Sequence, residues 1–302
     1  MSLSVGIVGL PNVGKSTLFN ALLKKQQAYV ANFPFATIEP NIGIVPVPDI
    51  RLTRLSQVVK ESEGLSFFPP EVPATVEFLD IAGLIAGAHK GEGLGNKFLS
   101  PVVVKIKDAL QKGVPAREVQ LNEEEGKISK QMSLLTSKPI LVVLNISETD
   151  LKNASELEEK YANEFGINKD QVVAISAKTE SELSELDEAD QKVYLNELGV
   201  EKSGLERLIQ KAFRSLGLIT FLTAGEKEVR AWTIHDDSNA VAAAGEIHTD
   251  FMKKFIKADV IPFENFVEVG GWKNAKDSGN VRSEGRDYIV KDGDVIEFKI
   301  GT

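Results

Sequence analysis

The sequence predicts an α/β protein, in which a parallel-rich sheet flanked by helices precedes a small β-rich α+β domain. Short apolar runs alternate with helical stretches through the first two thirds of the chain, which is typical of a parallel sheet covered by helices. The character changes near Leu218, where glycines and β-branched runs begin to dominate. We therefore expect a large domain over residues 1–218 and a smaller one over 219–302.

The composition is that of a soluble globular protein. The chain has 302 residues, of which 42% are hydrophobic and 26% are charged, and it contains no cysteine. The formal net charge of −9 argues against a broad electrostatic grip on DNA or on an anionic membrane. We see no apolar run of bilayer length and no signal-peptide pattern. The absence of cysteine excludes disulfides and thiolate metal sites. We expect a cytoplasmic protein.

Short apolar runs, each ending at a polar or glycine-bearing turn, are expected to form the main strands: Val5–Val8, Val76–Leu79, Ile140–Leu144 and Val172–Ile175. Asn41–Val47 is a further strand, which we place at an edge because Pro46 and Pro48 interrupt its backbone donors. In sheets of this kind, ligands bind at the carboxyl ends of the strands.

Three segments outside the strands carry clear signals. Leu151–Phe165 is rich in charge and predicts a helix, and Leu205–Leu216 predicts an amphipathic helix that ends before the capping glycine Gly217. In the second domain, the turn Lys291–Asp294 precedes a β-branched run. These signals support two helices against the sheet and a separate β-rich end of the chain.

A glycine-rich loop predicts a phosphate-binding site. Gly9–Ser16 reads G-L-P-N-V-G-K-S and lies between the first strand and a helical run that starts at Thr17. At such a turn, backbone N–H groups and the positive helix end face a polyphosphate. Lys15 would reach the outer phosphates, and the Ser16 hydroxyl would ligate Mg²⁺. The loop therefore predicts binding of a nucleoside triphosphate.

Two further motifs suit loops that respond to the terminal phosphate. Asp80 ends a strand in D-I-A-G, where it can hold Mg²⁺ through water while the Gly83 N–H contacts the γ-phosphate. Thr37 lies in a proline-bounded loop, from which its hydroxyl can complete the Mg²⁺ shell. Leu84 stands where Ras-like GTPases place the glutamine that orients the attacking water. Hydrolysis by that glutamine route is thus excluded.

The glycine-rich stretch from Gly83 to Gly95 is expected to form a second mobile switch. His89 lies within this stretch and could take part in proton transfer. An exposed loop histidine without a role is the more frequent case.

The expected base site departs from the guanine-specific pattern N-K-x-D. Asn145–Glu148 reads N-I-S-E, so Ile146 replaces the lysine, and the acid Glu148 is one methylene longer than aspartate. In guanine-specific proteins the aspartate carboxylate accepts two hydrogen bonds from the base, and this motif lacks that aspartate. Side-chain amide and backbone groups can instead form hydrogen bonds with adenine. Ser176-Ala177-Lys178 would supply the loop that closes over the base. We expect ATP to be preferred and GTP to be tolerated.

Several sequence blocks resemble the YchF/Obg-like ATPase family of P-loop proteins. They are G-L-P-N-V-G-K-S-T, N-F-P-F-A-T-I-E-P-N, D-I-A-G-L, G-E-G-L-G-N-K-F-L and N-I-S-E, and the tail from F-L-T-A-G onward resembles the TGS domain of that family. The resemblance covers nearly the whole chain. It implies a Mg²⁺-dependent ATPase with an Obg-type domain that also accepts GTP, binds ribosomes and acts in translation or stress responses.

The resemblance also carries over site residues. It implies Mg²⁺ contacts at Ser16 and Thr37, a K⁺-associated phosphate-loop asparagine at Asn12, and a hydrophobic substitute for the catalytic glutamine at Leu84. Catalysis would then depend on positioning by Lys15 and the Gly83 amide. The implied nucleotide contacts are Asn12, Val13, Gly14, Lys15, Ser16, Thr17, Asn145, Ile146, Glu148, Ser176 and Ala177.

One departure from the family concerns the middle of the sheet. In the family, F-L is followed by a further strand, a candidate catalytic histidine and a long helical hairpin, whereas here Phe98-Leu99-Ser100 runs directly into Pro101. Either Val102–Ile106 takes the place of that strand, or this sequence omits residues; we favour omission. The segment 101–138 would then be a truncated helical insertion. A missing interior strand would leave backbone groups unpaired.

Several functions remain open. The favoured hypothesis is an ATPase switch, and the alternatives are a nucleotide-gated binding module with negligible turnover and a GTP-specific Obg-type GTPase. A metabolic kinase is disfavoured because no acceptor site is evident. In the second domain, Lys253, Lys254 and Lys257 accompany Phe251 and Phe255 on a predicted helix over 250–257. Solvated lysines beside packed rings are the favoured interpretation, and contact with ribosomal RNA is the alternative.

Overall fold

The structure, a computed structural model, describes residues 4–32, 42–80 and 101–301. It comprises two compact units, one formed by residues 1–80 and 143–302 and the other by residues 81–142. The predictions for Thr37, Gly83, Leu84 and His89 lie outside the described residues. No helix in the described ranges is long and apolar enough to cross a membrane.

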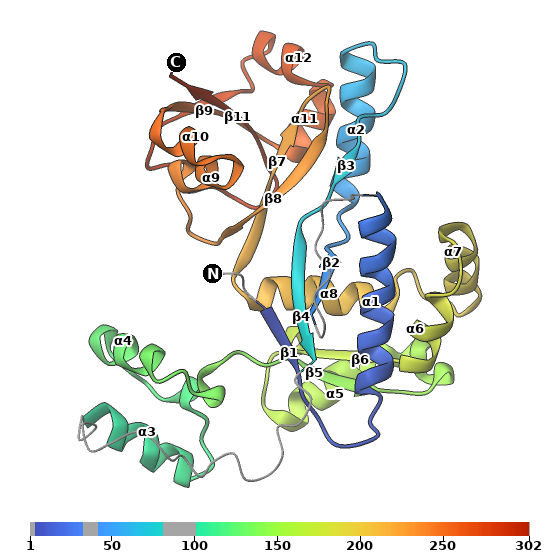
Figure 1. Ribbon diagram of the computed structural model, residues 1–302, viewed down its shortest axis with the longest axis vertical. Coiled ribbons are helices and arrows are strands. Elements are labelled where there is room, and N and C mark those ends of the chain that lie inside the picture. The colour runs from blue at the N-terminus through green and yellow to red at the C-terminus, as the bar shows by residue number, and fades with distance from the viewer. Residues whose placement is uncertain (1–3, 33–41, 81–100, 302) are drawn as a thin grey trace. The chain divides into compact units, whose positions relative to one another are not determined.

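A three-stranded sheet with strand order β1-β4-β2 carries the glycine-rich loop (Figure 1). β1 is parallel to β4 with Ile7 opposite Asp80, and β2 is antiparallel to β4. The prediction of an edge strand before Val47 is confirmed, since β2 lies at the edge of this sheet. The elements up to residue 80 are β1 Ser4–Ile7, α1 Lys15–Asn32, β2 Ile42–Pro46, α2 Ile50–Ser62, β3 Glu71–Val72 and β4 Thr75–Asp80.

A second, two-stranded sheet pairs β5 with β6. All four residues of β6 are buried, and α5 and α8 both contact this strand. The predicted helix over 151–165 begins three residues later, because a 3-10 turn precedes it. The elements are β5 Val142–Asn145, η3 Glu148–Asn153, α5 Ala154–Phe165, η4 Lys169–Gln171, β6 Val172–Ile175, α6 Ala177–Leu183, α7 Glu188–Glu197 and α8 Gly204–Ser215.

The α/β class is confirmed, but the described strands of the first domain form two separate sheets, not one continuous sheet. Within the described ranges, β1 is paired only with β4 and β5 only with β6. Gly6 of β1 and Val143 of β5 are exposed, whereas interior strands of a parallel sheet are covered on both faces. Both strands therefore keep one edge that no described strand pairs with.

Val102–Ile106 does not supply the missing strand, so the less favoured of the two alternatives is excluded. These residues belong to α3, and the side chains of Val102 and Ile106, four positions apart, pack together with Ala116. Spacing by four places apolar groups on one face of a helix, not of a strand. The described elements of this unit are α3 Pro101–Gln111, η1 Ala116–Glu118, α4 Glu123–Gln131 and η2 Leu135–Ser137.

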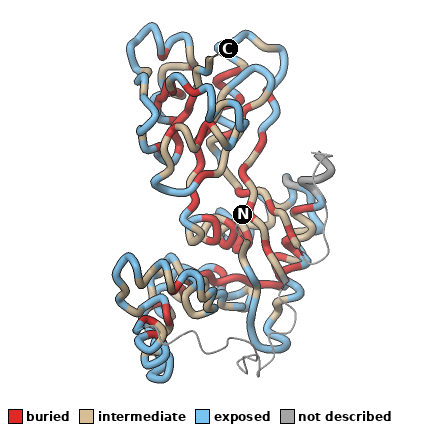
Figure 2. The backbone as a smooth tube through the Cα atoms, turned by 60° about the vertical axis from the view of Figure 1, so that its left-hand side comes forward, coloured by how far each residue is buried: buried red, intermediate tan, exposed pale blue. Residues whose placement is uncertain are grey.

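The C-terminal part of the chain forms a mixed sheet with strand order β10-β9-β11-β7-β8-β3. Helix α9 covers one face over a core that includes Phe221, Val260 and Ile296, and buried backbone runs through these strands (Figure 2). The elements are β7 Leu218–Ala224, β8 Val229–His235, α9 Ala240–Ile247, α10 Thr249–Lys253, β9 Phe255–Pro262, α11 Phe263–Val269, α12 Trp272–Asp277, β10 Arg282–Glu284 and β11 Asp294–Ile300.

The prediction of one helix over residues 250–257 was wrong. Helix α10 ends at Lys253, and Phe255 already belongs to strand β9, where its ring is buried in the core. Lys257 is bound to Asp259 and Ser283. Of the three lysines, Lys253 and Lys254 are exposed and Lys257 is half-buried. Phe255 lies in the core and Phe251 packs against it, so the two rings are packed as expected.

Arg51 links α2 to the C-terminal sheet. Its guanidinium donates to both carboxylate oxygens of Asp49, to Asp292 at 3.0 Å and to Thr220 at 2.8 Å. Gly293 allows this approach, because its φ is +83° and an added Cβ would lie 2.8 Å from an Arg51 nitrogen. The short strand β3 also pairs in parallel with β8. These contacts tie the C-terminal sheet to α2.

We predict that Arg51→Ala lowers the free energy of unfolding by about 2–3 kcal/mol, since half-buried carboxylates lose charge-assisted hydrogen bonds. Urea titration with tryptophan fluorescence measures this change. Arg54→Ala on the exposed face of α2 is the matched control. Equal effects of the two substitutions would contradict the structural role of Arg51.

Candidate nucleotide site

The glycine-rich loop leads from the carboxyl end of β1 to the amino end of α1. The strand ends at Ile7, and the helix begins at Lys15 with no acidic residue in its first turn. The positive end of an 18-residue helix is therefore uncompensated, which suits an anion. Asn12 has a φ of +62° and Gly14 one of +96°, so the loop curls back on itself.

Asn145 braces this loop. Its Nδ2 donates to the Val13 carbonyl at 3.2 Å, and its Oδ1 accepts from the Ala177 N–H at 3.1 Å. One amide side chain thus uses both its donor and its acceptor to join segments from three parts of the sequence. The phosphate loop and the predicted base loop are thereby held against each other.

Gly14 is required at the closest point of this assembly. A Cβ at this position would lie 3.0 Å from Asn145 Nδ2 and 3.4 Å from the Ala177 Cβ. Its φ of +96° is also unfavourable for any other residue. Glycine at this position therefore allows the turn and also allows the two loops to lie close together.

Lys15 and Ser16 occupy the first turn of α1. The Lys15 ammonium donates to the Leu10 carbonyl at 2.6 Å, so the side chain folds back over the loop. A polyphosphate placed against the loop amides would offer this ammonium a stronger, charged acceptor. Ser16 is exposed, which leaves its hydroxyl accessible to a ligand.

The predicted base loops adjoin each other at the ends of β5 and β6. The Ile146 N–H donates to the Ile175 carbonyl at 2.9 Å, and Glu148 opens η3 directly afterwards. Ser176 is 2% exposed, and its hydroxyl caps α6 by accepting from Thr179. The Ser176 side chain is therefore committed to the helix, and only its backbone is left to contact a base.

The residues predicted to hold Mg²⁺ are only partly described. Ser16 is the second residue of α1, which follows the loop from the carboxyl end of β1, and Asp80 ends the parallel strand β4 opposite Ile7. One hydroxyl, one carboxylate and phosphate oxygens suit Mg²⁺, which retains several waters. Within the described ranges, no cluster of three or more acidic or histidine side chains offers another metal site.

Comparison with known proteins gives matches along nearly all of the chain. Residues 4–146 match the family model described as a 50S ribosome-binding GTPase, and residues 218–301 match the YchF-GTPase C-terminal model, described as a protein of unknown function. "Ribosome-binding ATPase YchF" of Bacillus subtilis is 39% identical, with 99% of each chain covered. The corresponding Escherichia coli protein is also 39% identical at the same coverage.

The chain belongs to the YchF family of ribosome-binding ATPases.

Among solved structures, that of the Schizosaccharomyces pombe YchF GTPase matches with a TM-score of 0.79 and 27% identity, over 99% of this chain and 98% of the other. The alignment with the Bacillus relative extends over 375 positions, whereas this chain has 302 residues. The relative therefore carries residues with no counterpart here. This fits the omission that the sequence suggested and the unpaired strand edges.

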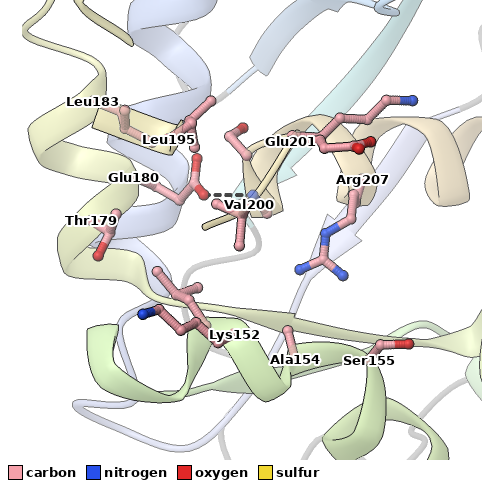
Figure 3. A pocket seen from close by; sticks show the side chains of 14 residues that line it. Lys152, Ala154, Ser155, Thr179, Glu180, Leu183, Leu195, Val200, Glu201 and Arg207 are labelled. Carbon is pink, nitrogen blue, oxygen red and sulfur yellow. Dashed lines mark hydrogen bonds between the residues drawn. The ribbon is translucent and has the colours of Figure 1, made fainter. Parts of the chain in front are cut away.

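A separate cavity of about 310 Å³ in this YchF family member is lined by residues of η3, α5, α6, α7 and the start of α8 (Figure 3). Its lining includes Lys152, Glu180, Leu195 and Arg207 but no residue of the phosphate loop. It is therefore not the nucleotide site.

Glu180, which lines this cavity, was not among the residues predicted from the sequence. Its carboxylate is 4% exposed and accepts from the Gly204 N–H at 2.7 Å, which caps α8. Burial raises the pKa of Glu180, while hydrogen bonds from Gly204, Ser203 and Leu205 oppose that rise. An isolated glutamate in a polar helix gives no sequence signal for such a role.

We predict that Asn145→Ala weakens Mg²⁺-ATP binding about tenfold, because two hydrogen bonds that hold the phosphate loop are lost. Calorimetric titration of both proteins measures this effect. Asn153→Ala, an exposed asparagine without a capping bond, should bind as the unmodified protein does. Unchanged affinity in Asn145→Ala would contradict the bracing role.

Glu180 should make stability depend on pH. Because its folded-state pKa lies above the usual 4.5, the native state binds the extra proton, and the free energy of unfolding falls as pH rises from 4.5 through the raised pKa. We predict that Glu180→Gln reduces this fall, as measured by urea unfolding at pH 4.5 to 7. Exposed Glu197→Gln is the control; an unaltered slope in Glu180→Gln would refute the effect.

Proposed function

We propose that this chain is a Mg²⁺-dependent nucleoside triphosphatase that prefers ATP over GTP and acts as a ribosome-associated switch in translation or stress responses. It would work in the cytoplasm. The observation that carries the proposal is the Asn145 brace, which brings the phosphate loop and the base loop to one place. A triphosphate with a purine base spans these two loops.

The base loop supports the ATP preference. Guanine offers two donors that a short aspartate carboxylate accepts together, and here Glu148 is longer and opens a 3-10 turn. Ile146 provides apolar contact without the positive charge of the usual lysine. The Bacillus subtilis relative is named an ATPase and the Schizosaccharomyces pombe relative a GTPase. Tolerance of GTP is compatible with a site that holds the base by packing and backbone groups.

In this proposal, catalysis comes from positioning and charge stabilisation. Lys15, the loop amides and the Gly83 N–H would bind the β- and γ-phosphate oxygens and stabilise the charge that develops on them. Ser16, Thr37 and Asp80 would hold Mg²⁺, which neutralises phosphate charge when bound. Asn12 lies in the loop with a positive φ and is the candidate neighbour of a K⁺ ion.

The ribosome is the proposed partner because the Bacillus subtilis and Escherichia coli relatives are named ribosome-binding ATPases. The C-terminal domain would take part, as an RNA contact through the exposed Lys253 and Lys254 or through other surfaces. We propose a domain boundary at Leu218, where β7 begins. We propose no role at a membrane or on DNA.

A nucleotide-gated binding module with negligible turnover is the second candidate function. The interrupted sheet favours it, because β1, which leads into the phosphate loop, keeps an edge without a described partner strand. Leu84 removes the glutamine route to hydrolysis. In this version, nucleotide binding alone changes the partner contact.

Single-turnover phosphate release, with and without K⁺, tests the enzyme against the module. We predict that Lys15→Ala lowers the release rate by about 10²–10³, since one donor to the transferred phosphoryl group is lost. Lys24→Ala, farther along the same helix, should retain the rate. No release by the unmodified protein, together with intact ATP binding, would select the binding module.

Parallel titration with Mg²⁺-ATP and Mg²⁺-GTP tests the base preference. We predict tighter binding of ATP, because the motif lacks the paired acceptors that select guanine. A GTP preference of about a hundredfold, nearly 3 kcal/mol, would instead select the Obg-type GTPase interpretation.

A further inference from the structure

A small cavity of about 190 Å³ lies where the end of α2 meets the C-terminal sheet, far along the chain from the phosphate loop. α2 contributes one wall, the turn between β7 and β8 a second, and α11 with α12 a third. The lining residues are Val59, Ser62, Glu63, Ala224, Gly225, Glu226, Phe266 and Trp272.

Two aromatic rings form part of this cavity. Phe266 and Trp272 meet edge to face, with ring centroids 5.2 Å apart. The Trp272 Nε1 donates to the Ala224 carbonyl at 3.2 Å, so the polar atom of the indole is already satisfied. Phe266 is fully buried, so the aromatic surface that a ligand can contact is that of the half-buried Trp272, and aromatic rings attract cations.

The indole of Trp272 already attracts an ammonium group outside the cavity. Lys276 Nζ lies 5.4 Å from the ring centroid and is also bound to Glu297 at 2.8 Å. Lys276 does not line the cavity. Its position shows that the surroundings of this ring accommodate a positive charge.

The charges that line the cavity are negative. Glu63 and Glu226 are exposed, and neither forms an ion pair with any described residue. Glu63 is also the C-cap of α2, so the negative end of the helix adds to these carboxylates. No lysine or arginine lines the cavity. Carboxylates beside an accessible aromatic ring suit a cation.

We propose that this cavity binds an arginine side chain from a basic segment of a partner protein. The guanidinium would lie against Trp272 and pair with Glu63 and Glu226, since a planar cation combines stacking with carboxylate pairing. The volume of about 190 Å³ is below the usual range for drug-sized ligands and suits a single side chain. The carboxylates disfavour the phosphates of RNA.

A fluorotryptophan-labelled full-length protein provides a direct test. The chain has two tryptophans, so Trp232→Phe assigns the two ¹⁹F resonances. The probe is a short peptide, acetyl-Gly-Arg-Gly-Arg-Gly-amide, and its citrulline counterpart is the neutral control. We expect the arginine peptide to shift the Trp272 resonance in a saturable manner and to bind at least tenfold more tightly than the citrulline peptide.

The double substitution Glu63→Gln with Glu226→Gln should weaken arginine-peptide binding at least tenfold. Glu264→Gln with Glu268→Gln, which removes two exposed charges from α11 outside the cavity, should have less than a twofold effect. Equal binding of both peptides, equal loss in both variants, or no Trp272 shift at millimolar peptide would overturn the proposal. ATP titration of the same samples reports on the nucleotide site separately.

Discussion

The hydrogen bonds of Asn145 are the interaction on which the candidate nucleotide site depends. Val13 lies in the loop after β1 and Ala177 begins α6, and within the described ranges β1 and β5 belong to different sheets. No described backbone ladder joins these sheets. The Asn145 side chain therefore joins two segments that backbone hydrogen bonds would hold together in a continuous sheet. This arrangement explains why the approach to Gly14 is so close.

The phosphate loop could be predicted from sequence because its signal is local. A strand, a glycine-rich turn and a helix follow one another within about twenty-five residues, and each has its own periodicity. The role of Asn145 in reaching Val13 depends on contacts 132 residues apart, which local patterns do not encode. The same holds for Glu180, whose partner Gly204 lies on another helix.

Two segments depart from their local pattern for a related reason. The β-branched run Val102–Ile106, for which a strand was the less favoured alternative, is helical, and Val102 and Ile106 pack at helical spacing against Ala116. Phe251 and Phe255 at positions four apart predicted one helix, but Phe255 is needed in the sheet core, so the chain extends there. Tertiary packing decided both cases over local propensity. The C-terminal sheet also gains β3 from residues 71–72, which no local pattern indicates.

The central claim is that the loop from Gly9 to Ser16 binds the phosphates of a nucleoside triphosphate. Calorimetric titration of the intact protein with Mg²⁺-ATP, and then with Mg²⁺-tripolyphosphate as a competitor without a base, tests it most directly. The account predicts one ATP bound per chain and displacement by tripolyphosphate. Binding of neither ATP nor GTP by folded protein, or ATP binding that tripolyphosphate leaves unaffected, would contradict it.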